Sequence, residues 1–257
     1  MSEIDRVLLT YLRSVKAISH GSLIEKFSYI LTNLSNSEDL SNQQLDLSNQ
    51  QLEPLLDKHI ASINTNITQH GFKIDRRKDE ISGVLYFVFI NSISDDVINS
   101  SSNYTVPELD TIKRIIAELV EAYGFQFSIG RVNAKQRVAS SLNKSLAEAD
   151  FFVDRLIDDG WFVSTKDERL LLSIRALSEL KTYLVDTFGT TADADGGIMH
   201  LCQHCKELVT LGKTKLEGDI RLSFHYKCYD VYSRARNVKF DPSQTEMERI
   251  GVDVGTL

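Results

Sequence analysis

The three cysteines of the chain all lie in one segment near its C-terminus, and their spacing constrains the fold more than any other feature. Cys202 and Cys205 are separated by two residues, and His225 and Cys228 repeat that separation further along the chain. This spacing lets both side chains of a pair converge on one ion from a tight turn or a helix start. Three thiolates and one imidazole complete a tetrahedral shell for Zn²⁺, whereas Mg²⁺ and Ca²⁺ prefer oxygen ligands. The sequence therefore predicts one zinc site.

Alternatives for this segment stay open at the level of sequence. His200 and His204 are substitutes for His225 as the fourth ligand. A Cys-x-x-Cys pair is also typical of redox proteins, although a redox pair has no need of a second His-x-x-Cys. Four protein ligands leave no open position for a catalytic water, so we expect the zinc to be structural. Zinc binding contributes on the order of 10 kcal/mol to folding, and this segment has too few large apolar residues for a core of its own.

Composition places the chain among soluble globular proteins. Of its 257 residues, 42% are hydrophobic and 25% are charged. The longest apolar run, residues 84–90, is far shorter than the ~20 residues that cross a bilayer, so no membrane association is expected. The N-terminus has no signal-peptide pattern, which predicts an intracellular protein with reduced cysteines. The formal net charge of −7 argues against broad electrostatic binding of nucleic acid.

Apolar periodicity predicts three helices over residues 4–15, 23–34 and 56–67, and then a hairpin of strands 72–76 and 82–90. Three helices followed by a hairpin is the order of a winged-helix domain, which we place at residues 1–92. Residues 35–53 are expected to be a loop expansion. They contain a tandem duplication, in which residues 39–45 recur as residues 46–52.

The same order recurs after a polar linker at residues 93–106. Helices are predicted from Pro107, over residues 129–142, and from a capping box at Ser145 and Glu148. A hairpin of strands 161–164 and 170–172 and a helix over residues 174–188 complete a second winged-helix domain, residues 107–188. The remaining segments are expected to be a linker (189–198), a RING-like zinc segment (199–236) and a disordered tail (237–257). The predicted fold class is α+β, with two tandem winged-helix domains followed by the zinc-stapled segment.

This order of domains resembles the family of non-structural maintenance of chromosomes element 1. The strongest local matches are residues 150–162, a helix leading into Gly-Trp-Phe, and residues 174–205, a helix leading into Cys-x-x-Cys. The resemblance covers most of residues 1–235. It implies a nuclear, chromatin-associated subunit of the SMC-five/SMC-six complex that acts in DNA repair and recombination. The implied partners are the MAGE-domain third non-SMC element, docked on the winged-helix region, and the kleisin-like fourth element.

The family ends in a variant RING, which implies ubiquitin-ligase activity and a ubiquitin-conjugating enzyme as a further partner. A RING has four ligand pairs, and its first and third pairs share one zinc; here these are Cys202/Cys205 and His225/Cys228. The second pair is expected within residues 211–220 and the fourth after Arg236, but neither stretch contains cysteine or histidine. One of the two zinc sites is therefore missing. The residues favour a reduced or lost ligase, against what the family resemblance implies.

The first predicted hairpin is basic. DNA phosphates are one ligand that fits its cationic side chains, which are Lys73, Arg76, Arg77 and Lys78. A solvated hairpin tip is the simpler interpretation, because Asp75, Asp79 and Glu80 offset much of that charge. The alternative function is a DNA-binding winged-helix protein with a structural zinc knuckle and no ligase activity, and the complex itself is a second route to DNA. No nucleotide-binding motif and no complete catalytic triad are present in the sequence.

Overall fold

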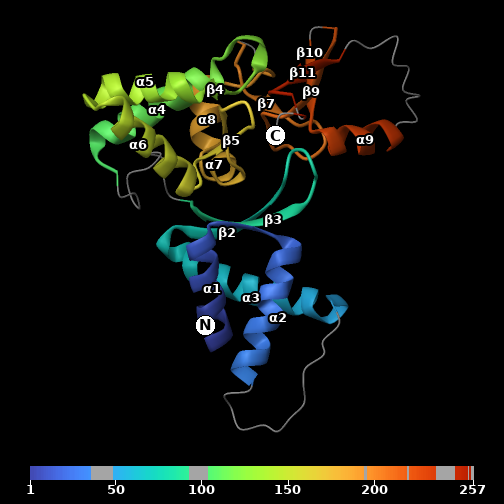
Figure 1. Ribbon diagram of the computed structural model, residues 1–257. Coiled ribbons are helices and arrows are strands. Elements are labelled where there is room, and N and C mark those ends of the chain that lie inside the picture. Colours follow the sequence, from blue (N-terminus) through green and yellow to red (C-terminus); the bar gives the residue numbers. More distant parts are fainter. Residues whose placement is uncertain are drawn as a thin grey trace. The chain divides into compact units, whose positions relative to one another are not determined.

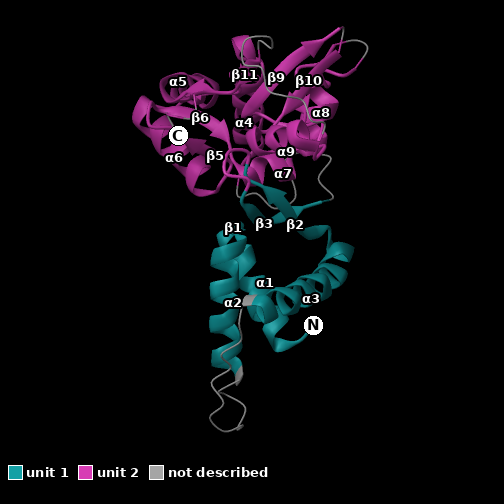
Figure 2. Ribbon diagram, turned by 90° about the vertical axis from the view of Figure 1, so that its right-hand side faces the viewer, with its two compact units in different colours: residues 1–79, 84–93 teal, residues 80–83, 94–257 magenta. Residues whose placement is uncertain are grey.

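The computed structural model describes residues 1–35, 49–92, 104–193, 196–218, 220–235, 247–253 and 255. The chain forms two compact units (Figure 2). The first comprises Met1–Asp79 and Val84–Ile93, and the second comprises Glu80–Gly83 and Ser94–Leu257. Helices and antiparallel sheets occur in both units, so the fold is of the predicted α+β class. The duplication spans residues 39–52, of which residues 39–48 lie outside the described residues.

The first unit runs helix, strand, helix, helix, strand, strand (Figure 1). Strand β3 lies between β1 and β2 and is antiparallel to both. The three helices and the hairpin match the prediction, whereas β1 is too short to leave a periodic pattern. The elements are α1 (Glu3–Val15), β1 (Ala17–Ser19), α2 (His20–Ser35), α3 (Asn49–Ile67), the 3-10 helix η1 (Thr68–His70), β2 (Phe72–Lys78) and β3 (Leu85–Asn91).

The core of the first unit lies between its helices and its sheet. It includes Leu8 of α1, Phe27 of α2, Ile63 of α3 and Phe87 of β3, all at most 1% exposed. Helix α3 begins at Asn49, earlier than predicted, and Leu52 packs into the same core. The predicted loop expansion of residues 35–53 therefore does not hold for residues 49–53, because burial of Leu52 extends the helix toward its N-terminus.

The second unit begins with the same order of elements. Strand β6 lies between β4 and β5, antiparallel to both. The capping box predicted at Ser145 and Glu148 is present. The elements are α4 (Val106–Val120), the 3-10 helix η2 (Tyr123–Phe125), β4 (Ile129–Gly130), α5 (Arg131–Leu142), α6 (Leu146–Asp158), β5 (Phe162–Ser164) and β6 (Arg169–Leu172).

The helix predicted over residues 174–188 is two helices, α7 (Ile174–Glu179) and α8 (Lys181–Phe188). The backbone of Leu180 leaves the helical region, with φ −95° and ψ 7°, and separates them. Leu180 itself is 1% exposed, so the break coincides with a fully buried side chain. A continuous stripe of leucines in the sequence carries no signal for this change of direction.

The described residues of the C-terminal segment form short strands and one helix. Strands β7 (His200–Leu201) and β8 (Leu208–Val209) form a two-stranded sheet. Strand β9 (Gly212–Glu217) is the centre of a three-stranded antiparallel sheet, between β10 (Ile220–Phe224) and β11 (Glu248–Ile250). Helix α9 (Tyr226–Ala235) follows β10. Figure 1 shows β9, β10 and β11 side by side, as the strand pairing requires.

The C-terminal segment shares one hydrophobic core with α4–α6 and β4–β6. Met199, Cys202, Leu208 and Val209 belong to the same buried cluster as the leucines and isoleucines of α4. Residues 189–198 are predicted to be a flexible linker, but Thr190 within them pairs with Met199 in a parallel bridge. The sequence predicts too few large apolar residues for a separate core in this segment. A core shared with α4–α6 and β4–β6 is consistent with that prediction.

The prediction of a disordered tail over residues 237–257 does not hold at β11. Ile250 is 0% exposed and packs in the shared core. Gly251 has a φ of 84°, and its N–H donates to the carbonyl of Phe125 at 2.8 Å. Ile250 and Val252 stand among polar residues and glycine, and this alternation is too short to predict a strand. No helix among the described residues is long and apolar enough to cross a membrane.

Candidate metal centre

The structure brings Cys202, Cys205, His225 and Cys228 together. One ligand atom from each lies within 4.8 Å of the other three, and the group can hold one metal ion. The Nδ1 atom of His225 is 3.4 Å from the Sγ atom of Cys205. Ligands at ~2.3 Å (sulfur) and ~2.0 Å (nitrogen) from a tetrahedral ion lie between about 3 and 4 Å apart, and the separation of His225 and Cys205 falls in this range. The donor set, three thiolates and an imidazole, suits Zn²⁺.

A tight turn between β7 and β8 positions the first two ligands. The N–H of Cys202 donates to the carbonyl of Glu207 at 2.8 Å, and the N–H of Lys206 donates back to the carbonyl of Cys202 at 2.9 Å. Lys206 has a φ of 62°, a left-handed conformation that reverses the chain directly after Cys205. These two bonds close the turn, so that the thiols of Cys202 and Cys205 face the same point.

The start of α9 positions the other two ligands. His225 follows β10 directly, and its carbonyl accepts the N–H of Tyr229 at 2.9 Å as the first bond of the helix. Cys228 lies three residues later, and residues three apart in a helix share one face. The parallel bridge between Cys202 and Ser223 joins this half of the centre to the turn of the first half.

The cluster has a buried side and a solvent side. Cys202 is 0% exposed and His225 is 6% exposed. Cys205 is exposed and Cys228 is intermediate. Cys202 belongs to the shared core and Cys228 packs against it, so the centre is anchored in the second unit and is not an isolated surface loop.

Electrostatics within the cluster favour the ionised thiol at Cys202, whereas the hydrogen bond with Cys202 and burial raise the pKa of the Cys205 thiol. A hydrogen bond with Cys205 lowers the pKa of the Cys202 thiol, although burial acts in the opposite direction. Burial opposes a charged His225, but hydrogen bonds with Cys202, Cys205 and Glu80 outweigh it and raise the pKa of the imidazole. Negative charge on sulfur is the charge that a divalent cation neutralises when it binds.

The tautomer of His225 follows from its partners. Its Nε2 atom lies 2.9 Å from the carbonyl oxygen of Leu208, and this oxygen can only accept a hydrogen bond. Nε2 therefore carries a hydrogen, and Nδ1, which faces the cysteines, offers its lone pair to the metal in the neutral ring. The Oε1 atom of Glu80 is a second neighbour of Nε2, at 3.3 Å.

The two alternative histidines lie outside the cluster. His200 is fully buried, its Nδ1 atom lies 2.8 Å from the Oγ atom of Ser223, and its ring packs on Phe125 with centroids 4.6 Å apart. Burial lowers the pKa of His200 to about 4, which keeps this ring neutral at physiological pH. His204 is exposed in the turn after Cys202.

The four basic residues predicted for DNA contact do not form one free cationic surface. Lys73 pairs with Asp75 at 2.8 Å, and Arg76 pairs with Asp57 at 2.7 Å. Arg77 is 4% exposed, whereas Lys78 is exposed. Lys73 and Arg76 are therefore ion-paired and Arg77 is buried, which leaves Lys78 as the member of the four that is exposed and has no ion pair with a described acidic residue.

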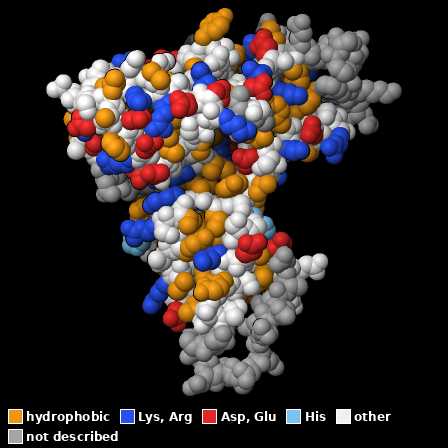
Figure 3. All heavy atoms as spheres, in the orientation of Figure 1, with side chains coloured by type: hydrophobic (Ala, Val, Ile, Leu, Met, Phe, Trp, Pro, Cys, Tyr) orange, Lys and Arg blue, Asp and Glu red, His pale blue; other side chains and the backbone are white. Residues whose placement is uncertain are grey.

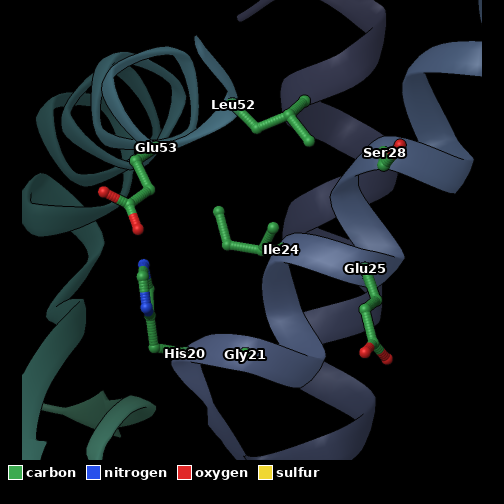
Figure 4. Close-up of a pocket in the computed structure, with 7 residues that line it drawn as sticks. All are labelled: His20, Gly21, Ile24, Glu25, Ser28, Leu52 and Glu53. Atoms are coloured by element: carbon green, nitrogen blue, oxygen red, sulfur yellow. The ribbon is translucent and has the colours of Figure 1, made fainter. Parts of the chain in front are cut away.

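A hollow of about 450 Å³ lies between α2 and α3 of the first unit. Figure 4 shows residues that line it. The side chains of His20 and Glu53 point toward one another across it, beside the apolar side chains of Ile24 and Leu52. The ring of His20 stacks on Phe87 with centroids 6.0 Å apart, which is a packing role. Among the described parts of the chain, the only group with metal-ligand spacing is the one around Cys202.

The fold and the site together define a class of protein. The order of elements in the first unit recurs at the start of the second unit, and the described residues of the C-terminal segment contain a candidate Cys3His metal centre. The chain belongs to the family described as "Nse1 non-SMC component of SMC5-6 complex", which matches residues 5–180. This confirms the family resemblance inferred from the order of domains.

Relatives in other organisms have the corresponding names. The non-structural maintenance of chromosomes element 1 homolog of Xenopus tropicalis is 21% identical over 180 residues, which cover 70% of this chain and 63% of the relative. The Schizosaccharomyces pombe protein, non-structural maintenance of chromosomes element 1, is 21% identical over 153 residues, 60% of this chain and 62% of its own length. The matched region spans less than two thirds of either relative.

A solved structure resembles nearly the whole fold. It is a chain of an "Nse1-Nse3-Nse4 complex", with a TM-score of 0.70 and 14% identity over 99% of both chains. At this identity the similarity is one of fold. It extends past residue 180, where the family match ends, through the metal centre.

Proposed function

We propose that this protein is a subunit of an SMC-five/SMC-six chromosome-maintenance complex, acting in DNA repair and recombination in the nucleus. Membership of the family and the similarity of fold over 99% of the chain to a member of an Nse1-Nse3-Nse4 complex carry this proposal. The role is that of a scaffold, in which two helical domains bind partner subunits and a metal centre holds the C-terminal segment.

Residues 1–92 and residues 107–188 are proposed to be winged-helix domains. Both have the order helix, strand, helix, helix, strand, strand, and in both the third strand lies between the first and the second. A helical triad with an appended hairpin is the definition of that fold. Winged helices dock proteins as well as DNA, and the net charge of −7 favours the protein partner here.

The proposed partners are a MAGE-domain third non-SMC element and a kleisin-like fourth element. The test is co-expression of the full chain with both partners from the same organism, followed by size-exclusion chromatography with light scattering. A single peak at the mass of a 1:1:1 complex is expected. Separate elution of the three chains at micromolar concentration would contradict the proposal, because subunits of a stable complex remain associated under those conditions.

The metal is proposed to be one structural Zn²⁺ ion bound by Cys202, Cys205, His225 and Cys228. Three cysteines and one histidine form a closed ligand set of the kind found in structural zinc sites. With all four positions filled by protein, the ion supplies folding energy and no bound water for hydrolysis. Elemental analysis of the purified full chain should give one zinc per molecule.

A separate question is whether the C-terminal segment has ubiquitin-ligase activity. The sheet β10-β9-β11 occupies the part of the segment in which the resemblance predicts a second pair of zinc ligands. Backbone pairing such as Phe224 with Lys213 and Ile250 with Gly212 can order this region without a metal. We infer a structural, RING-like module with reduced or absent ligase activity. An autoubiquitination assay with a panel of conjugating enzymes, in the presence of the MAGE-domain partner, tests this: robust chain formation would overturn it.

Direct DNA binding is the second candidate function, and exposed Lys78 in the basic hairpin is the observation that favours it. Basic and acidic side chains are interspersed over the face of the second unit seen in Figure 3, which weakens the case for a phosphate-binding surface there. The test is binding of a DNA duplex by the full chain between 50 and 200 mM salt. A steep salt dependence that Lys73→Ala/Lys78→Ala removes would support DNA binding. Arg77 is a poor target, because it is 4% exposed and its loss would perturb the fold.

A further inference from the structure

Glu80 is a buried carboxylate beside the metal centre, and the functions above assign it no role. It lies in the turn between β2 and β3, in the stretch Glu80–Gly83 that belongs to the second unit. It is 7% exposed, which is unusual for a glutamate. An ionised carboxylate at such a position has to be matched by hydrogen-bond donors, because burial of an unsatisfied charge is costly.

Those donors come from the loop between β8 and β9. The N–H of Thr210 donates to Oε1 of Glu80 at 2.7 Å, and the N–H of Leu211 donates to the same oxygen at 3.3 Å. The hydroxyl of Thr210 donates to Oε2 at 2.7 Å. These bonds fix the carboxylate against a segment 130 residues away in sequence.

The same carboxylate faces a metal ligand. Its Oε1 atom lies 3.3 Å from Nε2 of His225, which also lies 2.9 Å from the carbonyl oxygen of Leu208. Both neighbours are acceptors, so both favour the tautomer with hydrogen on Nε2 and leave Nδ1 for the metal. A carboxylate beyond a ligating histidine fixes its ring orientation and raises its basicity.

The rest of the turn is packed into the same region. Ile81 contacts the buried group of Leu171, Leu211 and Val252. A Cβ atom added to Gly83, which has a φ of 70°, would lie 3.1 Å from Cγ of Lys227, the residue before Cys228. The turn therefore lies against both halves of the centre, the loop after β8 and the start of α9.

We propose that Glu80 is a positioning residue of the metal centre, which holds His225 for ligation through Nδ1 and couples the order of the turn Glu80–Gly83 to metal binding. This inference rests on the proposed zinc site. Loss of the metal removes the restraint on His225 and so weakens its contact with the turn. Loss of the Glu80 carboxylate leaves the Leu208 carbonyl as the acceptor for Nε2 of His225. The two effects are reciprocal, because both follow from one set of contacts.

The test is a pair of matched substitutions in the full chain, Glu80→Gln and Glu207→Gln. Glu207 closes the ligand turn through its backbone carbonyl, which the substitution keeps, and its side chain pairs with Lys181 at 2.9 Å, so this variant is the control. Zinc affinity is measured by competition with a chromophoric chelator. Glu80→Gln is expected to weaken zinc binding about tenfold, the lower end for loss of such a partner, and Glu207→Gln to leave it unchanged.

Two further readouts separate positioning from a general loss of stability. In ¹⁵N-histidine NMR spectra of the zinc-loaded protein, His225 should show a metal-bound Nδ1 and a protonated Nε2, and Glu80→Gln should shift the Nε2 resonance. Hydrogen exchange over residues 80–83 should quicken when zinc is removed from the wild-type chain. If Glu80→Gln fails to fold, Thr210→Val removes one donor at constant volume and should weaken zinc binding in the same direction by a smaller factor.

The outcomes distinguish this inference from the proposed zinc site. A wild-type chain that binds no zinc removes both. A wild-type chain that binds zinc, with Glu80→Gln and Thr210→Val unchanged in affinity, overturns the role of Glu80 alone. Metal bound to Nε2 of His225 would also overturn it, because that atom would then be unable to donate toward Glu80 and Leu208.

Discussion

The carboxylate of Asp5 lies 2.6 Å from Nδ1 of His59 and thereby joins the first turn of α1 to α3 across 54 residues. The same carboxylate accepts the N–H of Ser2 at 2.8 Å and the hydroxyl of Ser62 at 3.0 Å. Asp5 is 2% exposed. One buried side chain thus caps a helix and connects it to its neighbour, so we expect it to contribute strongly to the stability of the first unit.

Replacing Asp5 by Asn should lower the free energy of unfolding of the first unit by about 2 kcal/mol, because it leaves buried donors without a charged acceptor. The control is Asp57→Asn, which removes the exposed partner of Arg76 and should cost less than about 1 kcal/mol. Urea unfolding followed by hydrogen exchange in α1 and α3 measures both. Equal effects of the two substitutions would contradict the role of Asp5.

The stability of the first unit should also depend on acid through Asp5. Burial alone would raise the pKa of Asp5, but hydrogen bonds from His59, Ser2 and Ser62 outweigh burial and lower it below 3.8. The ionised form is therefore favoured in the folded state. Its contribution is fully present above about pH 4 and is lost as the pH falls through the lowered value. The difference in stability between wild type and Asp5→Asn should shrink over that range, and a constant difference down to pH 2 would contradict this assignment.

Removing one ligand should release the metal without unfolding the first unit. Cys202→Ala and Cys205→Ala should each lose zinc, which is worth about 10 kcal/mol in small zinc domains, and hydrogen exchange should quicken over residues 199–235. Cys205 is exposed, so its substitution changes little besides the metal, whereas Cys202 also leaves a gap in the core. His204→Ala should keep its zinc. Elemental analysis decides the ligand set: a Cys205→Ala protein with one zinc would rule out Cys205.

Strand β11 should stabilise the C-terminal segment. Ile250→Ala should destabilise the second unit by about 2 kcal/mol, because it leaves a cavity in the shared core. Arg249→Ala, at an exposed position of the same strand, should cost less than about 0.5 kcal/mol. Thermal unfolding compares the two. If both variants unfold at the wild-type temperature, the strand does not contribute to the stability of the unit.

Local patterns in the sequence determined most of the helices and both hairpins. The apolar stripe of α1 and the capping box at Ser145 depend on residues within four positions of one another, so both can be recognised from the sequence alone. The pairs Cys202/Cys205 and His225/Cys228 are also local patterns, since the two members of each pair lie three positions apart. Few residue types bind a metal ion, so the two pairs could be assigned to one ion from the sequence. The family resemblance, too, followed from the order of these local elements.

Only the tertiary structure decided which distant segments share a core. Ile250 belongs to the same buried cluster as the leucines of α4, and Glu80 contacts Thr210 and His225, although these residues are more than one hundred positions apart in the sequence. A glutamate in a charged turn and an isoleucine in a polar tail carry no periodic signal. Burial of a residue depends on which distant segments pack against it, and these segments come together only when the chain folds.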